Sequence, residues 1–293
     1  MRLRSLLFVP GDSEKKFGKA RETGADALIL DLEDAVAASQ KPVAREMVKG
    51  WIDQANDIEP ALFVRVNPLD SGLTLADLAA VVRPGLAGIL VPKANGGHDI
   101  QRIDNYLSAL EETAGIAQGT VKIAVVCTET PAAMFALGTY QGASERLIGL
   151  TWGAEDLGAA IGITDNKEPD GSWTFPYQVA RAQCLFAASA AGVAPIDTLY
   201  GNFKDPEGLE TDCRRARRDG FTGRIAIHPA QVETINRCFT PSEEEVAFAR
   251  RVVEAFAANP TAGTLGIDGK MVDLPHLTAA RKTLAAAGVD ILD

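Results

Sequence analysis

Short apolar runs alternate with longer amphipathic segments along most of the chain. The apolar runs are continuous rather than alternating, which is typical of strands that are buried on both faces of a sheet. Strands that alternate with helices pair in parallel. The pattern predicts eight strands, at Ser5–Pro10, Ala27–Glu33, Ala61–Asn67, Ala87–Lys93, Lys122–Glu129, Arg146–Gly153, Ala194–Tyr200 and Arg224–Pro229.

The amphipathic segments between these runs predict helices at Ser13–Glu22, Pro42–Gln54, Asp99–Glu112, Pro131–Thr139, Tyr177–Ala191 and Leu209–Arg218. Eight strand–helix units match an α/β fold of the (β/α)8 TIM barrel type. A doubly wound sheet is the alternative, but no Gly-rich dinucleotide fingerprint follows the first strand. We therefore predict a barrel catalytic domain over residues 1–240 and a C-terminal helical extension over residues 241–293.

The extension has its own pattern. Residues 241–256 predict a helix with Ser242 as N-cap, residues 263–273 a turn or hairpin, and residues 275–288 a last helix that begins at Pro275. One face of the first of these helices is apolar, at Val246, Ala249, Val253 and Phe256. A barrel does not need these elements, so we expect them to form a lid or an oligomer contact.

Composition narrows the functional classes. The 293 residues are 46% hydrophobic, and 29 basic against 39 acidic residues give a net charge of −10. This balance argues against affinity for nucleic acid or membrane surfaces, although a local basic patch could still bind a phosphorylated ligand. No apolar run approaches the ~20 residues of a membrane span. The four scattered cysteines include no CxxC pair, so we expect a soluble cytoplasmic protein with reduced thiols.

Polar residues, most of them charged, gather where the predicted strands end. In a parallel barrel these ends meet on one face, where the sites of such folds lie. Helix N-capping explains any single carboxylate equally well, but convergence of the whole set with an arginine favours a site. The residues are Asp31, Glu33 and Asp34 after the second strand, Arg65 and Asn67 after the third, Lys93 after the fourth, Glu129 after the fifth, and Glu155 and Asp156 after the sixth.

Glu129 and Asp156 follow neighbouring predicted strands and should lie within reach of one ion. Two carboxylates, with room for water and ligand oxygens, suit Mg²⁺, with Mn²⁺ as the alternative. No Cys/His cluster competes as a zinc site, because the three histidines are far apart in sequence. Of these, His228 is better explained as a helix-entry or packing residue than as a catalyst.

Arg65 interrupts the apolar strand FVRVN. A buried guanidinium needs an anionic partner, and its fork fits a carboxylate or a pair of carbonyl oxygens. The sequence leaves two roles for Arg65: an internal ion pair with Asp31 or Glu33, or contact with substrate. The two roles are compatible, since an acid could orient an arginine that binds substrate.

Lys15 and Lys19 are spaced i,i+4 on the first predicted helix, so they point the same way. Together with the helix N-terminus they could hold phosphates, while Phe8 packs on an adenine or pantetheine group. Two solvated surface lysines are the alternative.

Eight motifs occur in order along nearly the whole chain: RSLLFVPGDSEKKFGKA, LILDLEDAVAASQKPVAR, FVRVN, VPKA, ETP, TWGAEDL, IHPAQV and GKMVDLP. Together they resemble the citrate lyase β-subunit-like group of the HpcH/HpaI aldolase superfamily, which is close to malyl-CoA and citramalyl-CoA lyases. The resemblance implies a Mg²⁺-dependent barrel that assembles as a homotrimer or hexamer. Such a protein cleaves or forms carbon–carbon bonds beside a CoA or acyl-carrier thioester.

The resemblance also implies roles for individual residues. Glu129 and Asp156 would be the metal ligands, Arg65 would bind the oxygen of the 2-oxo acid, and Asp273 would be the catalytic acid/base that a neighbouring subunit delivers. Asp268 competes with Asp273 for that role. Contacts with CoA would come from Phe8, Lys15, Lys19 and the backbone of Ile225 and Ala226, Glu129 would also contact substrate, and Glu33 and Asp34 would support the site.

The resemblance favours cleavage of a 3-hydroxyacyl-CoA, such as malyl-CoA or citramalyl-CoA, into an acyl-CoA and a 2-oxo acid. Three alternatives remain. The chain could be a malyl-CoA-type thioesterase, or the β subunit of a citrate lyase that acts on a citryl-carrier protein. It could also be a barrel that binds a ligand without catalysis.

Overall fold

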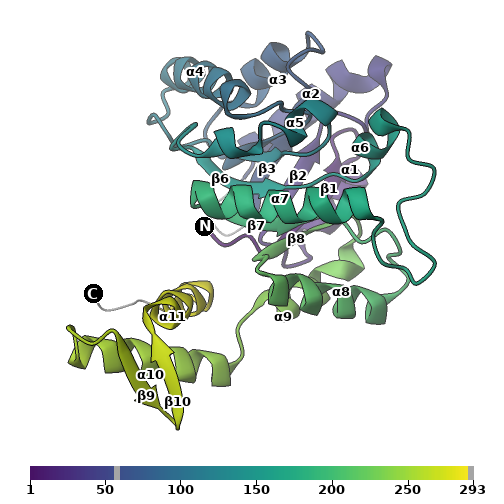
Figure 1. Ribbon diagram of the computed structural model, residues 1–293. Coiled ribbons are helices and arrows are strands. Elements are labelled where there is room, and N and C mark those ends of the chain that lie inside the picture. Colours follow the sequence, from purple (N-terminus) through teal and green to yellow (C-terminus); the bar gives the residue numbers. More distant parts are fainter. Residues whose placement is uncertain (56–59, 290–293) are drawn as a thin grey trace. The chain divides into compact units, whose positions relative to one another are not determined.

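A computed structural model describes residues 1–55 and 60–289 and contains a closed barrel of eight parallel strands (Figure 1). The strands pair in sequence order, and β1 closes the barrel against β8 through the register Leu6↔Ile225. The predicted TIM barrel is therefore confirmed, and the doubly wound sheet is excluded. The strands are β1 Ser5–Pro10, β2 Ala27–Asp31, β3 Ala61–Arg65, β4 Gly88–Val91, β5 Lys122–Val126, β6 Leu147–Thr151, β7 Ala194–Asp197 and β8 Gly223–Ala226.

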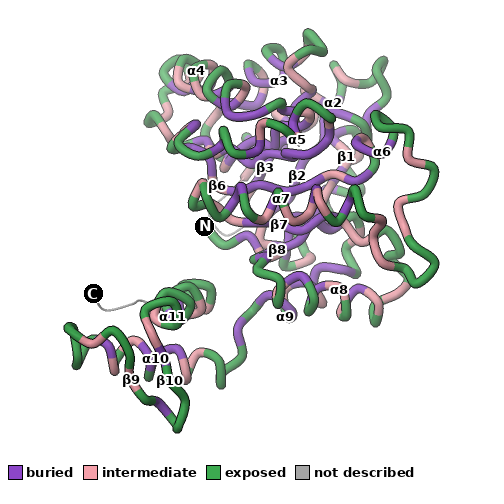
Figure 2. Tube along the Cα trace, viewed as in Figure 1, coloured by how far each residue is buried: buried purple, intermediate pink, exposed green. Residues whose placement is uncertain are grey.

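The strands are buried almost throughout, as their continuous apolar runs predicted (Figure 2). Side chains from several strands fill the barrel interior, among them Leu6, Ile29, Phe63, Leu90 and Ile225. The interior is tight enough to restrict residue type, since a Cβ at Gly88 would overlap the Phe63 ring. The barrel is thus a packed core, and its site must lie at the strand ends.

Helices connect the barrel strands at α1 Glu14–Arg21, α2 Lys41–Asp53, α3 Thr74–Val81, α4 Gly97–Ala114, α5 Pro131–Met134, α6 Glu155–Ile161, α7 Phe175–Ala191 and α8 Pro206–Asp219, and α9 Val232–Phe239 follows β8. Short 3₁₀ turns add η1 Ala38–Gln40, η2 Leu137–Tyr140 and η3 Pro229–Gln231. The single helix predicted over 131–139 was wrong. It is divided into α5 and η2, and Thr139 in η2 accepts a hydrogen bond from the Gly97 N–H at the start of α4.

Several predicted strands run past the observed ends. The strand predicted over Ala27–Glu33 ends at Asp31 in the structure, and the strand predicted over Lys122–Glu129 ends at Val126. One more backbone hydrogen bond to the next strand follows each end, from Leu32 to Arg65 (3.0 Å) and from Cys127 to Thr151 (2.8 Å). After β2 a side chain then takes over: the Asp31 carboxylate accepts the N–H groups of Glu33 (2.9 Å) and Ala35 (3.1 Å). The polar residues at the strand ends therefore build loops rather than sheet.

The chain divides into two compact units, one spanning Leu3–Asn236 and the other beginning at Arg237. The second unit contains α10 Glu243–Ala258, the hairpin β9 Thr264–Ile267 and β10 Lys270–Asp273, and α11 Leu274–Ala286. The predicted helices and hairpin are confirmed, and the four residues of the predicted apolar face belong to this unit's hydrophobic cluster. That the unit serves as a lid or oligomer contact stays a prediction.

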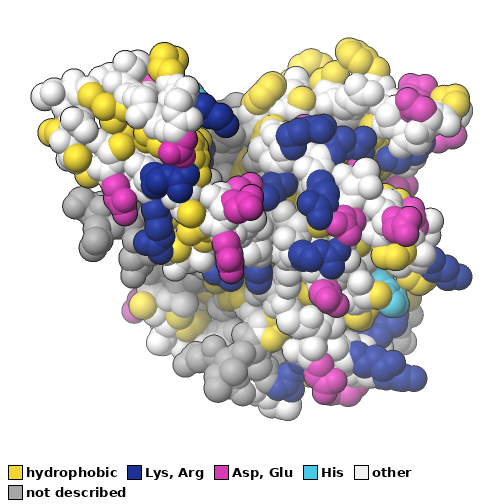
Figure 3. Space-filling model, turned by 90° about the horizontal axis from the view of Figure 1, so that it is seen from below, with side chains coloured by type: hydrophobic (Ala, Val, Ile, Leu, Met, Phe, Trp, Pro, Cys, Tyr) yellow, Lys and Arg dark blue, Asp and Glu magenta, His cyan; other side chains and the backbone are white. Residues whose placement is uncertain are grey.

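Acidic and basic side chains are interspersed on the face of the molecule that Figure 3 shows. Along the described ranges, 1–55 and 60–289, no helix is both long and apolar enough to cross a membrane. All four cysteines lie among the described residues, where they are buried thiols outside any disulfide bond.

Ser242 is expected to stabilise the second unit through its cap. Its side chain accepts the Glu245 N–H (3.2 Å), and Glu245 accepts the Ser242 N–H (2.7 Å). Ser242→Ala should cost about 1 kcal/mol. Hydrogen exchange in α10 should accelerate accordingly, whereas Ser189→Ala, at an exposed serine in α7, should leave α10 protection unchanged.

Candidate active site

The loop after β2 carries three carboxylates. Asp31 ends the strand and is buried, and its hydrogen bonds to Glu33 and Ala35 close the loop. Lys41 also fixes the loop, because its Nζ donates to the Glu33 carbonyl (2.9 Å) and to Asn67 Oδ1 (2.6 Å). The loop thus presents acidic side chains from a fixed backbone.

Arg65 ends β3 and meets this loop. Its Nε and Nη2 donate to the two oxygens of Asp31 (2.7 and 2.6 Å), and its Nη1 lies 2.9 Å from Glu33 Oε2. The guanidinium carbon lies 4.7 Å from the centroid of the Phe8 ring. Burial opposes the charge, but the bonds to Asp31 and Glu33 outweigh it and raise the pKa of Arg65. The internal pair that the sequence left open is confirmed with both acids.

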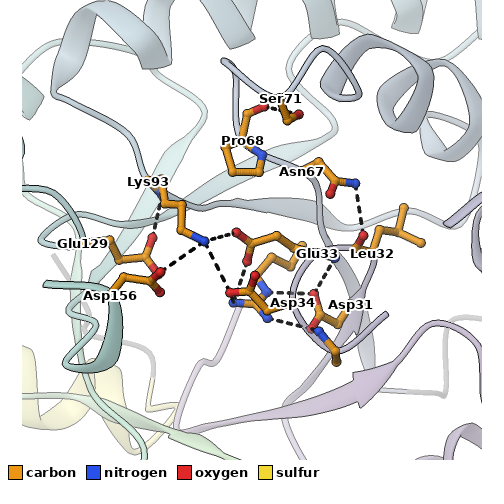
Figure 4. Close-up of polar contacts among 12 residues, drawn as sticks. Asp31, Leu32, Glu33, Asp34, Asn67, Pro68, Ser71, Lys93, Glu129 and Asp156 are labelled. Atoms are coloured by element: carbon orange, nitrogen blue, oxygen red, sulfur yellow. Dashed lines mark hydrogen bonds and ion pairs between the residues drawn. The ribbon is translucent and has the colours of Figure 1, made fainter. Parts of the chain in front are cut away.

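Lys93 follows β4 and connects the acidic loop with the next two strands (Figure 4). Its Nζ lies 2.5 Å from Glu33 Oε1, 3.3 Å from Asp34 Oδ2 and 3.3 Å from Asp156 Oδ1. Its backbone N–H donates to Glu129 Oε2 at 2.5 Å. The sequence placed Lys93 at a strand end but gave no sign of these contacts.

Glu129 follows β5, and Asp156 lies in the first turn of α6. Burial raises the pKa of Glu129 to about 8, and the charges of Asp156 and Glu33 add to this rise against the opposing Lys93 N–H. Gly153 makes room for the pair, because a Cβ there would lie 2.9 Å from Glu129 Cγ. The two carboxylates predicted to share an ion therefore share one site.

Both carboxylates and Arg65 line a cavity of about 170 Å³, which we call the acidic cavity. Its remaining walls are mainly apolar, formed by residues such as Phe8, Leu90, Val126, Trp152, Trp173, Leu199 and Ile225. A few polar groups therefore line a small, mainly apolar chamber, an arrangement typical of small-molecule sites.

A second cavity, of about 550 Å³, shares Phe8, Arg65 and Leu199 with the acidic cavity. We call it the basic cavity, because Lys16 and Lys19 line it. Lys15 is exposed on α1 and is not part of this lining. Ala226, which was predicted beside Ile225, is buried at the end of β8.

His228 also lines the basic cavity. It caps η3, where its Nδ1 accepts the Ala230 N–H (3.2 Å), and its ring stacks on Phe203 with centroids 4.6 Å apart. The predicted helix-entry and packing role of His228 is confirmed.

Asp273 belongs to the second unit. It ends β10 and caps α11, accepting the His276 N–H (3.3 Å), and its Oδ1 lies 2.5 Å from His276 Nδ1. The hydrogen bond to His276 lowers the pKa of Asp273. Asp268, the competing candidate, occupies the hairpin turn and pairs with Arg251 at 2.8 Å. Delivery of Asp273 by a neighbouring subunit stays a prediction.

Glu129 and Asp156 fit a magnesium ion. No cluster of three or more His, Cys, Asp or Glu side chains suited to a metal occurs among the described residues. Mg²⁺ does not need one, since it takes one or two carboxylates and completes its shell with water and substrate oxygens. The raised pKa of Glu129 marks a buried carboxylate whose charge is poorly compensated, and a bound divalent cation reverses that. Mn²⁺ prefers the same oxygen ligands.

Trp173 is a cavity residue that the sequence did not single out, although it lies in the long segment after β6. Its ring packs edge-on against Trp152 at 5.1 Å, and Lys167 Nζ lies 3.2 Å from its centroid. Trp173 thereby joins the long loop to the wall of the acidic cavity. The available signal was a lone tryptophan in the mostly polar loop between α6 and α7, residues 162–174.

The chain matches known proteins over most of its length. The model of the HpcH/HpaI aldolase/citrate lyase family matches residues 4–229. A (3S)-malyl-CoA thioesterase of Cereibacter sphaeroides is 36% identical over 97% of this chain and 94% of its own length. A citrate lyase subunit beta of Haemophilus influenzae is 34% identical over 97% and 96%. The structure of protein CitE from Mycobacterium tuberculosis in complex with magnesium, acetoacetate and coenzyme A superposes with a TM-score of 0.75, at 32% identity and coverage of 97% and 98%.

Proposed function

Because the chain belongs to the HpcH/HpaI aldolase/citrate lyase family, we propose that it is a Mg²⁺-dependent carbon–carbon lyase. Its substrate is a 3-hydroxyacyl-CoA, such as malyl-CoA or citramalyl-CoA, and its products are an acyl-CoA and a 2-oxo acid. One observation carries the proposal: Glu129, Asp156 and Arg65 line one small cavity, and this adjoins a larger cavity lined by lysines. The first suits the reacting end of the substrate and the second its phosphates.

The chain's residues divide the work of cleavage. Glu129 and Asp156 hold the metal, and bound Mg²⁺ would lower the pKa of the substrate hydroxyl and stabilise negative charge on its oxygen. Arg65, oriented by Asp31 and Glu33, faces the oxo acid with a fixed positive charge. The apolar walls keep water from the reacting bond.

Protons and electrons must balance along this route. The hydroxyl loses its proton, and the bond between the hydroxyl carbon and the α-carbon of the thioester breaks as the carbonyl of the oxo acid forms. The α-carbon keeps the electron pair as a thioester enolate and then takes up a proton. Asp273 of a neighbouring subunit in a homotrimer or hexamer is the acid/base in this proposal.

The basic cavity is expected to hold the phosphates of CoA. Lys19→Ala and Lys16→Ala should each raise the KM for the CoA thioester about tenfold, since each removes a charge-assisted phosphate contact. The kcat should stay within twofold. Lys15→Ala is the matched control, because the resemblance favours Lys15 whereas the cavity lining favours Lys16; an effect confined to Lys15 would contradict the placement of the phosphates.

A thioesterase is the second candidate, because one of the similar proteins is named a (3S)-malyl-CoA thioesterase. The same carboxylates could position a water for attack on the thioester carbonyl. A third candidate is the β subunit of citrate lyase, after the relative from H. influenzae. In that role this chain would need a separate carrier protein to present its substrate.

The test is to incubate the protein with Mg²⁺ and malyl-, methylmalyl-, citramalyl- or citryl-CoA while 2-oxo acid and free CoA are measured separately. Oxo acid with an intact acyl-CoA supports the lyase. Free CoA with the hydroxy acid supports the thioesterase and contradicts the main proposal. Activity on a citryl-carrier protein alone would favour the citrate lyase subunit.

A further inference from the structure

Lys93 connects the two carboxylates of the acidic cavity with the acidic loop after β2. Its backbone binds Glu129 (2.5 Å), and its side chain contacts Asp156 (3.3 Å) and Glu33 (2.5 Å). Lys93 is not among the residues that line either the acidic or the basic cavity. It is therefore placed to act on the carboxylates rather than on the substrate.

The backbone of Lys93 is in an unusual conformation. Among the described residues only Lys93 (φ 51°) and Asp268 (φ 53°) combine a side chain with positive φ. Asp268 lies in a tight hairpin turn, where positive φ is required. Lys93 lies at a strand end, and the left-handed conformation costs about 1–2 kcal/mol there. Such a conformation persists when its contacts demand it, and here it accompanies the N–H donated to Glu129.

The ammonium of Lys93 is shared by three carboxylates. It lies within ion-pair distance of Glu33, Asp34 and Asp156 (Figure 4). A divalent ion on Asp156 would share that carboxylate with the ammonium, and like charges a few Å apart repel strongly in a partly buried site. The ammonium must therefore weaken the hold of Asp156 on any cation.

We propose that Lys93 is a positioning residue that sets the magnesium affinity of the site. Its backbone N–H fixes the carboxylate of Glu129, and its ammonium holds Asp156 toward Glu33 and competes with the ion for it. The inference rests on the magnesium site of the proposed function. It adds that the chain tunes this site toward weaker, exchangeable binding, at a residue that touches neither ion nor substrate.

Titration calorimetry with MgCl₂, without substrate, tests the role of the ammonium. Lys93→Met should bind Mg²⁺ about tenfold more tightly than the wild type. Its kcat should fall, because Glu33 loses a partner that helps it orient Arg65. Lys41→Met is the matched control: it also removes an ammonium that contacts the acidic loop, but Lys41 contacts the Glu33 carbonyl and Asn67 rather than either metal ligand. Its magnesium affinity should equal that of the wild type.

Lys93→Gly provides a second variant in case Lys93→Met folds poorly. Glycine keeps the N–H to Glu129 and adopts positive φ without strain, which offsets part of the loss of the ion pair with Glu33, so the variant should fold and also bind Mg²⁺ more tightly. Unchanged or weaker binding in both folded variants overturns the inference while leaving the proposed function intact. Absence of magnesium binding by the wild type, even with a 2-oxo acid present, overturns both.

Discussion

Replacement of Glu129 by Gln is expected to lower Mg²⁺-dependent turnover by about 10³-fold, because loss of a ligand removes several kcal/mol of charge stabilisation by the metal. The fold should survive, since the amide oxygen of glutamine can still accept the Lys93 N–H. Steady-state kinetics at saturating Mg²⁺, with circular dichroism to verify folding, measure this. Glu145→Gln, at an exposed glutamate outside the cavity lining, is the control and should retain full activity. Normal turnover by Glu129→Gln would contradict the role of Glu129 as a metal ligand.

The same variant has an expected effect on stability. The pKa of Glu129 is raised from an ordinary 4.5 to about 8 in the folded chain, so its contribution to stability is complete below pH 4.5 and is lost as the pH rises to about 8. Without metal, the wild type should therefore be less stable at pH 8.5 than at pH 5.5, by up to a few kcal/mol at about 1.4 kcal/mol per pKa unit. Glu129→Gln should show less of this decline. Thermal unfolding in EDTA at the two pH values measures the difference, and added Mg²⁺ should stabilise only the wild type.

Replacement of Arg65 by Met should destabilise the barrel by about 3–5 kcal/mol, because it leaves the buried carboxylates of Asp31 and Glu33 without their guanidinium partner. Turnover should fall as well, since the positive charge in the acidic cavity is lost. The stability and turnover of Arg65→Lys should lie between those of the wild type and Arg65→Met, because an ammonium keeps the charge but cannot form the bidentate pair with Asp31. Urea unfolding provides the stability measurement.

The exposed pair Arg214–Glu210 on α8 provides the control for Arg65. Its ion pair has the same 2.6 Å distance as the Arg65–Asp31 pair, but the Arg214 side chain is 67% exposed and that of Arg65 is 13% exposed. Arg214→Met should cost less than about 0.5 kcal/mol. Equal losses for Arg65→Met and Arg214→Met would show that burial does not set the strength of the Arg65 pair.

The fold could be predicted because continuous apolar strands and amphipathic helices alternate so regularly. The strand ends were less accessible to prediction. Apolar character continues past Asp31 to Leu32, but from Glu33 onward the Asp31 carboxylate takes over the backbone hydrogen bonds, which the apolar pattern does not reveal. Similarly, the helix pattern over 131–139 gave no sign of the break between α5 and η2, or of the contact that Thr139 in η2 makes with Gly97 on another element.

The meeting of Glu129, Asp156 and Arg65 could be predicted because strand order alone brings the ends of parallel strands together. The contacts of Lys93 could not, since they depend on a positive φ and on the path of a long side chain. Lys16 and Lys15 are neighbours in sequence, and only the rotation of α1 about its axis decides which lines the basic cavity. The role of Asp273 depends on a neighbouring subunit and stays a prediction.

The most direct test of the account is cleavage of malyl-CoA by the wild-type protein with Mg²⁺ in D₂O, followed by mass spectrometry of the products. A carbon–carbon lyase that forms a thioester enolate should yield glyoxylate and intact acetyl-CoA carrying one deuterium on its methyl group. The label should depend on Mg²⁺ and vanish in Glu129→Gln. Free CoA and malate without deuterium on carbon would contradict the account and identify a thioesterase instead.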